Sequence, residues 1–85
     1  MKTIKEYRLK KDVITPQTFY ITKGAEVVNA IDLDFDLALI VLCDATSIES
    51  DLRTFRVCSL YETIYDDNIK YICNFGTQHV VEILQ

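Results

Sequence analysis

The chain has 85 residues, of which 49% are hydrophobic, and its formal net charge at pH 7 is −4. This length allows one domain, spanning residues 1–85, and the apolar content excludes a disordered chain, which needs low hydrophobicity and high net charge. The negative charge argues against nonspecific nucleic-acid binding, because phosphates attract a positive field.

The predicted elements are short strands separated by turn signals. Apolar, β-branched and aromatic runs predict strands at residues 3–9, 17–22, 26–33, 37–43, 52–59, 69–75 and 79–84. Turns are predicted at Thr15-Pro16, Lys23-Gly24 and Gly76-Thr77. About seven short strands predict an all-β or mainly β fold, either a small antiparallel sandwich or a partly open barrel.

Three segments stand out along this series. Residues 1–11 hold five basic residues and one acidic residue, which gives +4, and we interpret them as an edge strand protected by lysine rather than as a nucleic-acid arm. Residues 37–43 are apolar on both predicted faces, so we expect a strand covered on both sides. Residues 60–68 form the longest irregular stretch.

The cysteines and the N-terminus predict a cytoplasmic protein. Cys43, Cys58 and Cys73 lie inside apolar segments and are odd in number, as expected of free, buried thiols in a reducing compartment. Residues 1–6 lack the apolar stretch of a secretory signal, and the apolar run at 37–43 is too short to span a membrane. The high apolar content of so small a domain also predicts a homo-oligomer, since some apolar surface remains to be covered.

The residue inventory predicts a protein that is not an enzyme and holds no metal or cofactor. His79 is the single histidine, and no Gly-x-Ser-x-Gly turn or Cys-x-x-Cys pair occurs. The acidic run at 32–36 superficially resembles a calcium loop, but it lacks the required glycine, and Cys43 stands where the bidentate Glu belongs. Two widely separated glycines cannot build a phosphate-binding loop.

One predicted strand combines basic and aromatic side chains. Alternation places Arg53, Phe55 and Val57 on one face and Thr54, Arg56 and Cys58 on the other. An arginine near an aromatic ring can hold a phosphate while a base stacks nearby. The residues alone favour the ordinary alternative, in which the arginines lie on an exposed strand and the aromatic side chains fill the core.

The candidate ligand-binding residues are Lys23, Arg53, Thr54, Arg56 and Tyr61. In this hypothesis the arginines and the lysine bind phosphate, with backbone amides near Gly24 adding an anion contact. The threonine hydroxyl contacts phosphate or a base edge, and the tyrosine ring stacks.

Four segments, in this order along nearly the whole chain, resemble a widespread family of small bacteriophage proteins. They are Lys23-Gly24-Ala25-Glu26-Val27, the apolar run 39–44 that ends in an acid, Arg53-Thr54-Phe55-Arg56-Val57 and Tyr71-Ile72-Cys73-Asn74-Phe75. Two departures occur: the tryptophan often present in the central strand is replaced by Leu39-Ile40, and the Gly-rich turn after the arginine strand by residues 58–61. If that turn helps to build a ligand site, the site here is changed or lost.

This family is similar in size and charge to the viral cyclic-nucleotide sponges. The resemblance implies an oligomeric anti-defence protein for immune evasion, which binds and sequesters cyclic oligonucleotide signals of systems such as CBASS without cleaving them. Two alternatives stay open: a small acidic interaction protein that blocks a host protein through the acidic clusters at 32–36 and 66–67, or a structural phage component.

Overall fold

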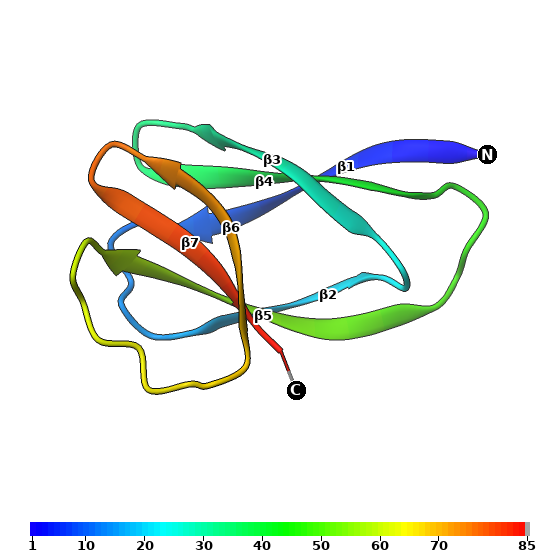
Figure 1. Cartoon of the computed structure of the whole chain (residues 1–85). Coiled ribbons are helices and arrows are strands. Elements are labelled where there is room, and N and C mark those ends of the chain that lie inside the picture. Colours follow the sequence, from blue (N-terminus) through cyan, green and yellow to red (C-terminus); the bar gives the residue numbers. More distant parts are fainter. Residues whose placement is uncertain (85) are drawn as a thin grey trace.

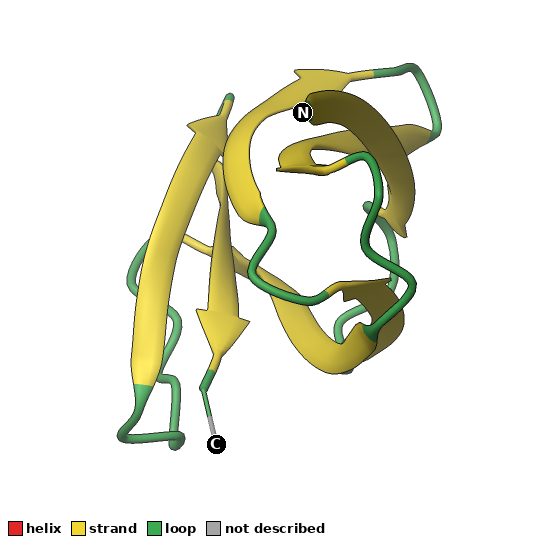
Figure 2. Ribbon diagram, turned by 90° about the vertical axis from the view of Figure 1, so that its right-hand side faces the viewer, coloured by secondary structure: helices red, strands yellow, loops and turns green. Residues whose placement is uncertain are grey.

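Two antiparallel sheets make up residues 1–84, the part of the chain that the computed structural model describes (Figure 1). The seven strands are β1 (Lys2–Lys10), β2 (Gln17–Thr22), β3 (Glu26–Asp32), β4 (Asp36–Asp44), β5 (Ser50–Ser59), β6 (Ile69–Phe75) and β7 (Gln78–Ile83). Sheet A has the order β1-β4-β3, and sheet B has the order β2-β5-β7-β6. Figure 2 shows the described chain as strands and loops only. The predicted small antiparallel sandwich is confirmed.

The observed strands follow the predicted ones closely, with small differences at their ends. β5 begins at Ser50 rather than at Leu52, because Ser50 and Asp51 continue the ladder with Thr22 and Ile21 of β2. Along the rest of β5, side chains alternate between the two faces of sheet B as predicted, with Phe55 buried toward the core and Arg56 on the outer face. β1 is an edge strand, as predicted from its lysines. Residues 60–68 form no regular element, also as predicted.

The core lies between the sheets and comes from alternate residues of each strand. β4 contributes Leu37, Leu39, Val41 and Cys43, which are at most 1% exposed. The largest inward side chain of sheet B is Phe55, which is fully buried. The prediction that β4 is covered on both faces holds fully for its inner face; on its outer face Ala38 is buried, whereas Ile40 and Leu42 are half-buried.

The connection between β5 and β6 passes over the outer face of sheet B. β5 and β6 each pair antiparallel with β7, so the chain must return along the sheet between them. Arg56 lies on the outer face of β5, and its guanidinium pairs with Glu62 in the connection. Val81 and Cys58, also on this outer face, are only 4% exposed. Sheet B therefore has a partial cover built from its own chain.

The three cysteines differ in burial, although the sequence predicted buried thiols at all three positions. Cys43, Cys58 and Cys73 are free, and the first two are buried while Cys73 is half-buried. Within residues 1–84 no helix has the length and apolar character needed to cross a bilayer.

Candidate functional site

Four connections come together at one end of the sandwich, the end where β1, β3 and β5 finish (left in Figure 1). We call this surface the loop end; it comprises residues 10–16, 32–36, 60–66 and 75–78. The opposite end carries the β2–β3 turn and the β4–β5 connection, where the Lys23 N–H donates to the Glu49 carbonyl at 2.9 Å. Three of the exposed aromatic residues, Phe35, Tyr61 and Tyr65, lie at the loop end.

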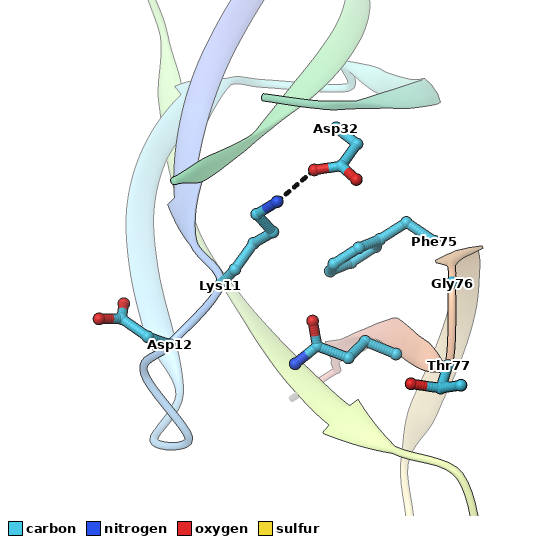
Figure 3. Close-up of a pocket in the computed structure, with 7 residues that line it drawn as sticks. Lys11, Asp12, Asp32, Phe75, Gly76 and Thr77 are labelled. Atoms are coloured by element: carbon cyan, nitrogen blue, oxygen red, sulfur yellow. Dashed lines mark hydrogen bonds and ion pairs between the residues drawn. The ribbon is translucent and has the colours of Figure 1, made fainter. Parts of the chain in front are cut away.

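The loop end contains a shallow cavity of about 440 Å³ (Figure 3). Its lining residues are Lys11, Asp12, Asp32, Phe75, Gly76, Thr77 and Gln78. Lys11 forms an ion pair with Asp32, and its Nζ lies 5.8 Å from the centroid of the Phe75 ring. Only 18% of the Lys11 side chain is exposed. The cavity thus offers a fixed cation beside a carboxylate and an aromatic ring, a combination suited to a planar polar ligand.

Local backbone chemistry fixes the walls of this cavity. The Gln17 side chain accepts from the Lys10 N–H at 2.8 Å and donates to the Lys10 carbonyl at 2.9 Å, which ties down the start of the β1–β2 connection. On the other side, Phe75 pairs with Gln78 across a two-residue turn. Gly76 has φ +56° at the first turn position, a conformation that glycine adopts without a steric penalty.

Two further depressions lie on either side of the connection 11–16. One, of about 370 Å³, is lined by Lys10, Lys11 and Asp12 together with residues 34–36. The other, of about 380 Å³, is lined by residues 14–16, Arg56, Tyr65 and Asp66. The connection therefore links the acidic cluster at 32–36 with Asp66, although the two are far apart in the sequence.

Large apolar side chains stand out from the loop end into solvent. Phe35 is 87% exposed, Tyr65 is 88% exposed and Ile14 is 74% exposed. Phe35 lies between two carboxylates in the sequence, and Tyr65 precedes one. Exposed apolar groups gathered in one place are typical of an interaction surface rather than of ordinary protein exterior.

The loop end carries the whole net charge of the chain. Its charged residues are Lys10, Lys11, Asp12, Asp32, Asp34, Asp36, Glu62 and Asp66. Two cations and six carboxylates give −4, and the complete chain is also −4, so the residues outside the loop end sum to zero. The field at this end therefore attracts positive ligands and repels polyanions.

Arg53, one of the five candidate ligand-binding residues, forms its hydrogen bonds inside the sandwich. Its Nε and Nη2 donate to the Glu82 carboxylate at 2.6 and 2.7 Å, and its Nη1 donates to the Ala25 carbonyl at 2.6 Å. The hydrogen bond to Glu82 raises the pKa of Arg53 further above its ordinary value. Arg53 and Thr54 do line one depression of about 380 Å³. Glu82 lines it too, and its carboxylate already accepts the hydrogen bonds of the Arg53 guanidinium.

The other predicted site residues lie in separate places. Arg56, on the outer face, donates from Nε to the Ile14 carbonyl at 3.1 Å and pairs with Glu62. The Thr54 hydroxyl is 2.9 Å from that of Thr18. Lys23 is at the opposite end of the sandwich, 3.3 Å from a Glu49 carboxylate oxygen. Tyr61 is 95% exposed at the loop end.

The structure does not bring these five residues into one constellation. Arg53 faces inward, Thr54 and Arg56 face outward, and Lys23 is at the far end. The sequence did not identify Lys11, Phe75 and Phe35 as site residues. They lie in three different connections or strand ends, and only the arrangement of the strands brings these to the same end of the sandwich. The signal present in the sequence is Phe35 itself, an aromatic residue between two aspartates in a predicted turn.

The reactive side chains lie apart from the loop end cavity. Burial raises the pKa of the Cys58 thiol, with the nearby Glu62 charge adding to the shift, and burial alone raises that of Cys73. The Tyr71 hydroxyl is 2.9 Å from His79 Nδ1 on the outer face of sheet B. Among residues 1–84 no three His, Cys, Asp or Glu side chains gather closely enough to hold a metal ion.

Comparison with protein-family models, curated proteins and solved structures gave no match. The function is therefore inferred from the loop end, whose charge and exposed aromatic residues are the most distinctive features of the described surface.

Proposed function

We propose that this protein is a non-catalytic binding protein that holds a partner protein with a basic surface at the loop end. One observation supports this most strongly: the loop end carries −4 and the rest of the chain sums to zero. A charge gathered on one surface steers a complementary partner to that surface and repels partners of like charge.

The apolar side chains of the loop end supply the contacts that charge alone does not. Phe35 and Tyr65 are more than four-fifths exposed and each adjoins a carboxylate in the sequence. Aromatic anchors surrounded by charged groups are the usual composition of a protein-binding hot spot. Burying both rings on a partner would remove from water two of the large exposed apolar groups of this end.

Binding without turnover is also supported by the state of the reactive groups. The thiols of Cys58 and Cys73 have raised pKa values, which disfavours the nucleophilic thiolate. The His79 ring nitrogen Nδ1 is 2.9 Å from the Tyr71 hydroxyl, and the Cys58 thiol donates at 3.7 Å to the His79 backbone carbonyl rather than to the ring that would activate it.

The proposal is tested by pull-down from the lysate of the source cell with the full chain as bait. The decisive variant is Asp34→Asn/Asp66→Asn, which removes two carboxylates from the loop end. The matched control is Glu49→Gln/Asp51→Asn, which removes two exposed carboxylates from the opposite end. A basic protein should be recovered in stoichiometric amount by the wild type and by the control variant, and lost with the loop-end variant.

Two outcomes count against this proposal. A bait that recovers no protein above background leaves the charged surface without a partner. A partner retained equally by the loop-end variant binds elsewhere, and the loop end is then not the binding surface.

A second candidate is the sequestration of cyclic oligonucleotides. Two features favour it: the resemblance to small phage proteins and the cavity that places Lys11 above Phe75. In this cavity a base would stack on the Phe75 ring, and Lys11 would exchange its Asp32 contact for a phosphate. The −4 charge of the loop end works against this ligand, because carboxylates repel phosphates.

Titration calorimetry with cyclic di- and trinucleotides tests the second candidate. Heat of binding that Phe75→Ala abolishes and Tyr20→Ala leaves unchanged would support it; Tyr20 is a 71% exposed aromatic residue outside the cavity. If no nucleotide gives heat of binding at micromolar protein concentration, the sequestration of cyclic oligonucleotides is rejected.

A further inference from the structure

The connection from β5 to β6, residues 60–68, crosses the length of sheet B. β5 ends at the loop end and β6 begins at the opposite end, because both strands pair antiparallel with β7 (the connection is yellow in Figure 1). We call residues 60–68 the strap. Under it lie Cys58 and Val81, two side chains on the outer face of sheet B that are only 4% exposed.

The strap is longer than this crossing requires. Ten residue steps lead from Ser59 to Ile69, and a fully extended chain of that length reaches about 33 Å. The crossing spans about 20 Å, since it covers the length of β7 from Gln78 to Ile83 and two strand spacings. The position of the strap is therefore set by its contacts and not by tension in the chain.

Few contacts hold the strap against the sheet. Taken as whole residues, only Ile64 of the strap is half-buried, and the other eight are exposed. Glu62 forms an ion pair with Arg56, and the side chains of these two residues are 29% and 19% exposed. At the far end, the Leu84 N–H donates to the Asn68 carbonyl at 2.8 Å. The middle of the strap thus depends on one apolar side chain and one ion pair.

The start of the strap is a tight turn that Glu62 holds in place. The Glu62 N–H donates to the Ser59 carbonyl at 3.1 Å, and a Glu62 carboxylate oxygen accepts from the Ser59 N–H at 3.1 Å. Between them Tyr61 has φ +67°, a left-handed conformation that is unfavourable for a residue with a Cβ. Loss of the Glu62 contacts would let this turn relax.

Arg56 joins the strap to a second connection of the loop end. Its Nη2 pairs with Glu62, and its Nε donates to the Ile14 carbonyl at 3.1 Å in the connection 11–16. The depression of about 380 Å³ between the two connections is lined by residues 14–16, Arg56, Tyr65 and Asp66. One guanidinium therefore fixes both walls of this depression.

We propose that the Arg56–Glu62 pair is a latch that holds the strap closed over sheet B and thereby assembles this part of the loop end. With the latch closed, Tyr65 lies beside residues 14–16 in a fixed arrangement. With the latch open, the slack of the strap lets Tyr65 move away, and the covered side chains of sheet B become accessible to water.

The latch makes Arg56 a positioning residue for partner binding at the loop end, and this part of the inference rests on the proposed function. A partner that contacts both Ile14 and Tyr65 needs the two side chains held together, and ordering them during binding would cost affinity. By the same linkage, a bound partner should favour the closed strap.

Alkylation of the native protein with iodoacetamide tests the latch without a partner. Cys58 lies under the strap, whereas Cys43 lies in the core and is 1% exposed, so Cys43 reports unfolding of the whole chain. In the wild type both thiols should react at the rate of unfolding. In Arg56→Met, Cys58 should react at least tenfold faster than Cys43 in the same molecules, and this ratio cancels any change in overall stability.

Electrostatics alone would change the labelling rate in the opposite direction. Burial and the Glu62 charge raise the pKa of the Cys58 thiol, and the Arg56 charge lowers it. Removing Arg56 therefore leaves less thiolate, which would slow the labelling of Cys58. Faster labelling of this thiol reports access through an open strap.

Lys23→Met is the matched control for Arg56→Met. Lys23 lies 3.3 Å from a Glu49 carboxylate oxygen, and this ion pair also joins two connections, at the opposite end of the sandwich. Its loss should leave the labelling ratio of Cys58 to Cys43 within twofold of the wild-type value.

Reversal of the two charges separates the ion pair from a general effect of substitution. Arg56→Glu opposes two carboxylates and should raise the labelling ratio at least tenfold. Arg56→Glu/Glu62→Arg restores an ion pair and should return the ratio to within threefold of wild type. Equal rates for Cys58 and Cys43 in folded Arg56→Met and Arg56→Glu would overturn the latch.

The positioning role is measured with the recovered basic partner. Arg56→Met should weaken its affinity at least fivefold, and Lys23→Met should leave it within twofold. Because Arg56→Met makes the surface more negative, electrostatics alone would strengthen the binding of a basic partner, so a loss of affinity reports positioning. Unchanged or tighter binding would overturn the positioning role. If no basic partner is recovered, the proposed function fails, and the latch is still decided by the labelling ratio.

Discussion

The Arg53 guanidinium and the Glu82 carboxylate form a two-pronged ion pair inside the sandwich, with donor–acceptor distances of 2.6 and 2.7 Å. The pair joins two neighbouring strands of sheet B, and Arg53 also reaches across to the Ala25 carbonyl beside β3. Only 5% of the Glu82 side chain is exposed, so its charge depends on this one partner. The arginine guanidinium is therefore engaged within the fold.

Removing the arginine alone should destabilise the protein strongly. We expect Arg53→Met to lower the free energy of unfolding by about 3 kcal/mol, because it leaves the Glu82 charge buried without a partner. For a chain of this length that is a large share of the total, which is about 4–13 kcal/mol. Urea denaturation followed by circular dichroism measures the change.

The double variant Arg53→Met/Glu82→Leu is the matched control for this prediction. It removes both charges and leaves apolar groups of similar size, so it should lose about 1 kcal/mol or less. A single variant as stable as the wild type would show that the ion pair contributes little to the fold.

Partner binding should depend on the aromatic side chains of the loop end. Phe35→Ala and Tyr65→Ala should each weaken the affinity for the recovered partner by about tenfold or more, since truncating a hot-spot residue costs 2 kcal/mol or more. Both side chains are almost free of contacts in the isolated chain, so the unfolding midpoint should stay unchanged.

Ile48→Ala serves as the control for these aromatic variants. Ile48 is 98% exposed and lies in the β4–β5 connection at the opposite end of the sandwich. Its truncation should leave the affinity unchanged. Equal losses for all three variants, measured by biolayer interferometry, would mean that exposed apolar area in general, rather than the loop end, drives the binding.

The thiols should be unreactive in the folded protein and should make its stability fall in alkali. Burial raises the pKa values of Cys58 and Cys73 above the ordinary 9.0. Unfolded thiols ionise first as the pH passes 9, so their contribution to stability is complete below that pH and is lost above it. We expect wild-type protein to lose more stability between pH 8 and pH 10 than Cys58→Ser/Cys73→Ser does.

Alkylation with iodoacetamide checks the same prediction by a second route. Near pH 8 the half-buried Cys73 should react first, and Cys43 and Cys58 should react only as fast as the protein unfolds. Rapid labelling of Cys58 in native protein would contradict the burial described above, as would equal alkaline losses in the two proteins.

The strands could be predicted from the sequence because their signals are local. Alternating apolar residues identified all seven strands, and Gly76-Thr77 identified the final turn, since periodicity and turn chemistry act over a few residues. The faces of β5 followed in the same way. The extra two residues at the start of β5 were missed because Ser50 and Asp51 owe their strand conformation to pairing with β2.

The site was harder to predict because it depends on contacts between distant segments. The sequence placed Arg53 on one face of a strand but could not show that Glu82 lies opposite it on β7. It identified the acidic cluster at 32–36 but not that Asp66 lies on the other side of the connection 11–16. Partners of charged side chains are set by strand order, which has no local signature.

Partner binding at the loop end is decided by the affinity of the recovered basic partner for three proteins, measured by titration calorimetry at one salt concentration. The wild type and Glu49→Gln/Asp51→Asn should bind equally within twofold, and Asp34→Asn/Asp66→Asn should bind at least tenfold more weakly. Equal affinity of all three proteins, or conversion of the partner into a product during the titration, would contradict binding without turnover at the loop end.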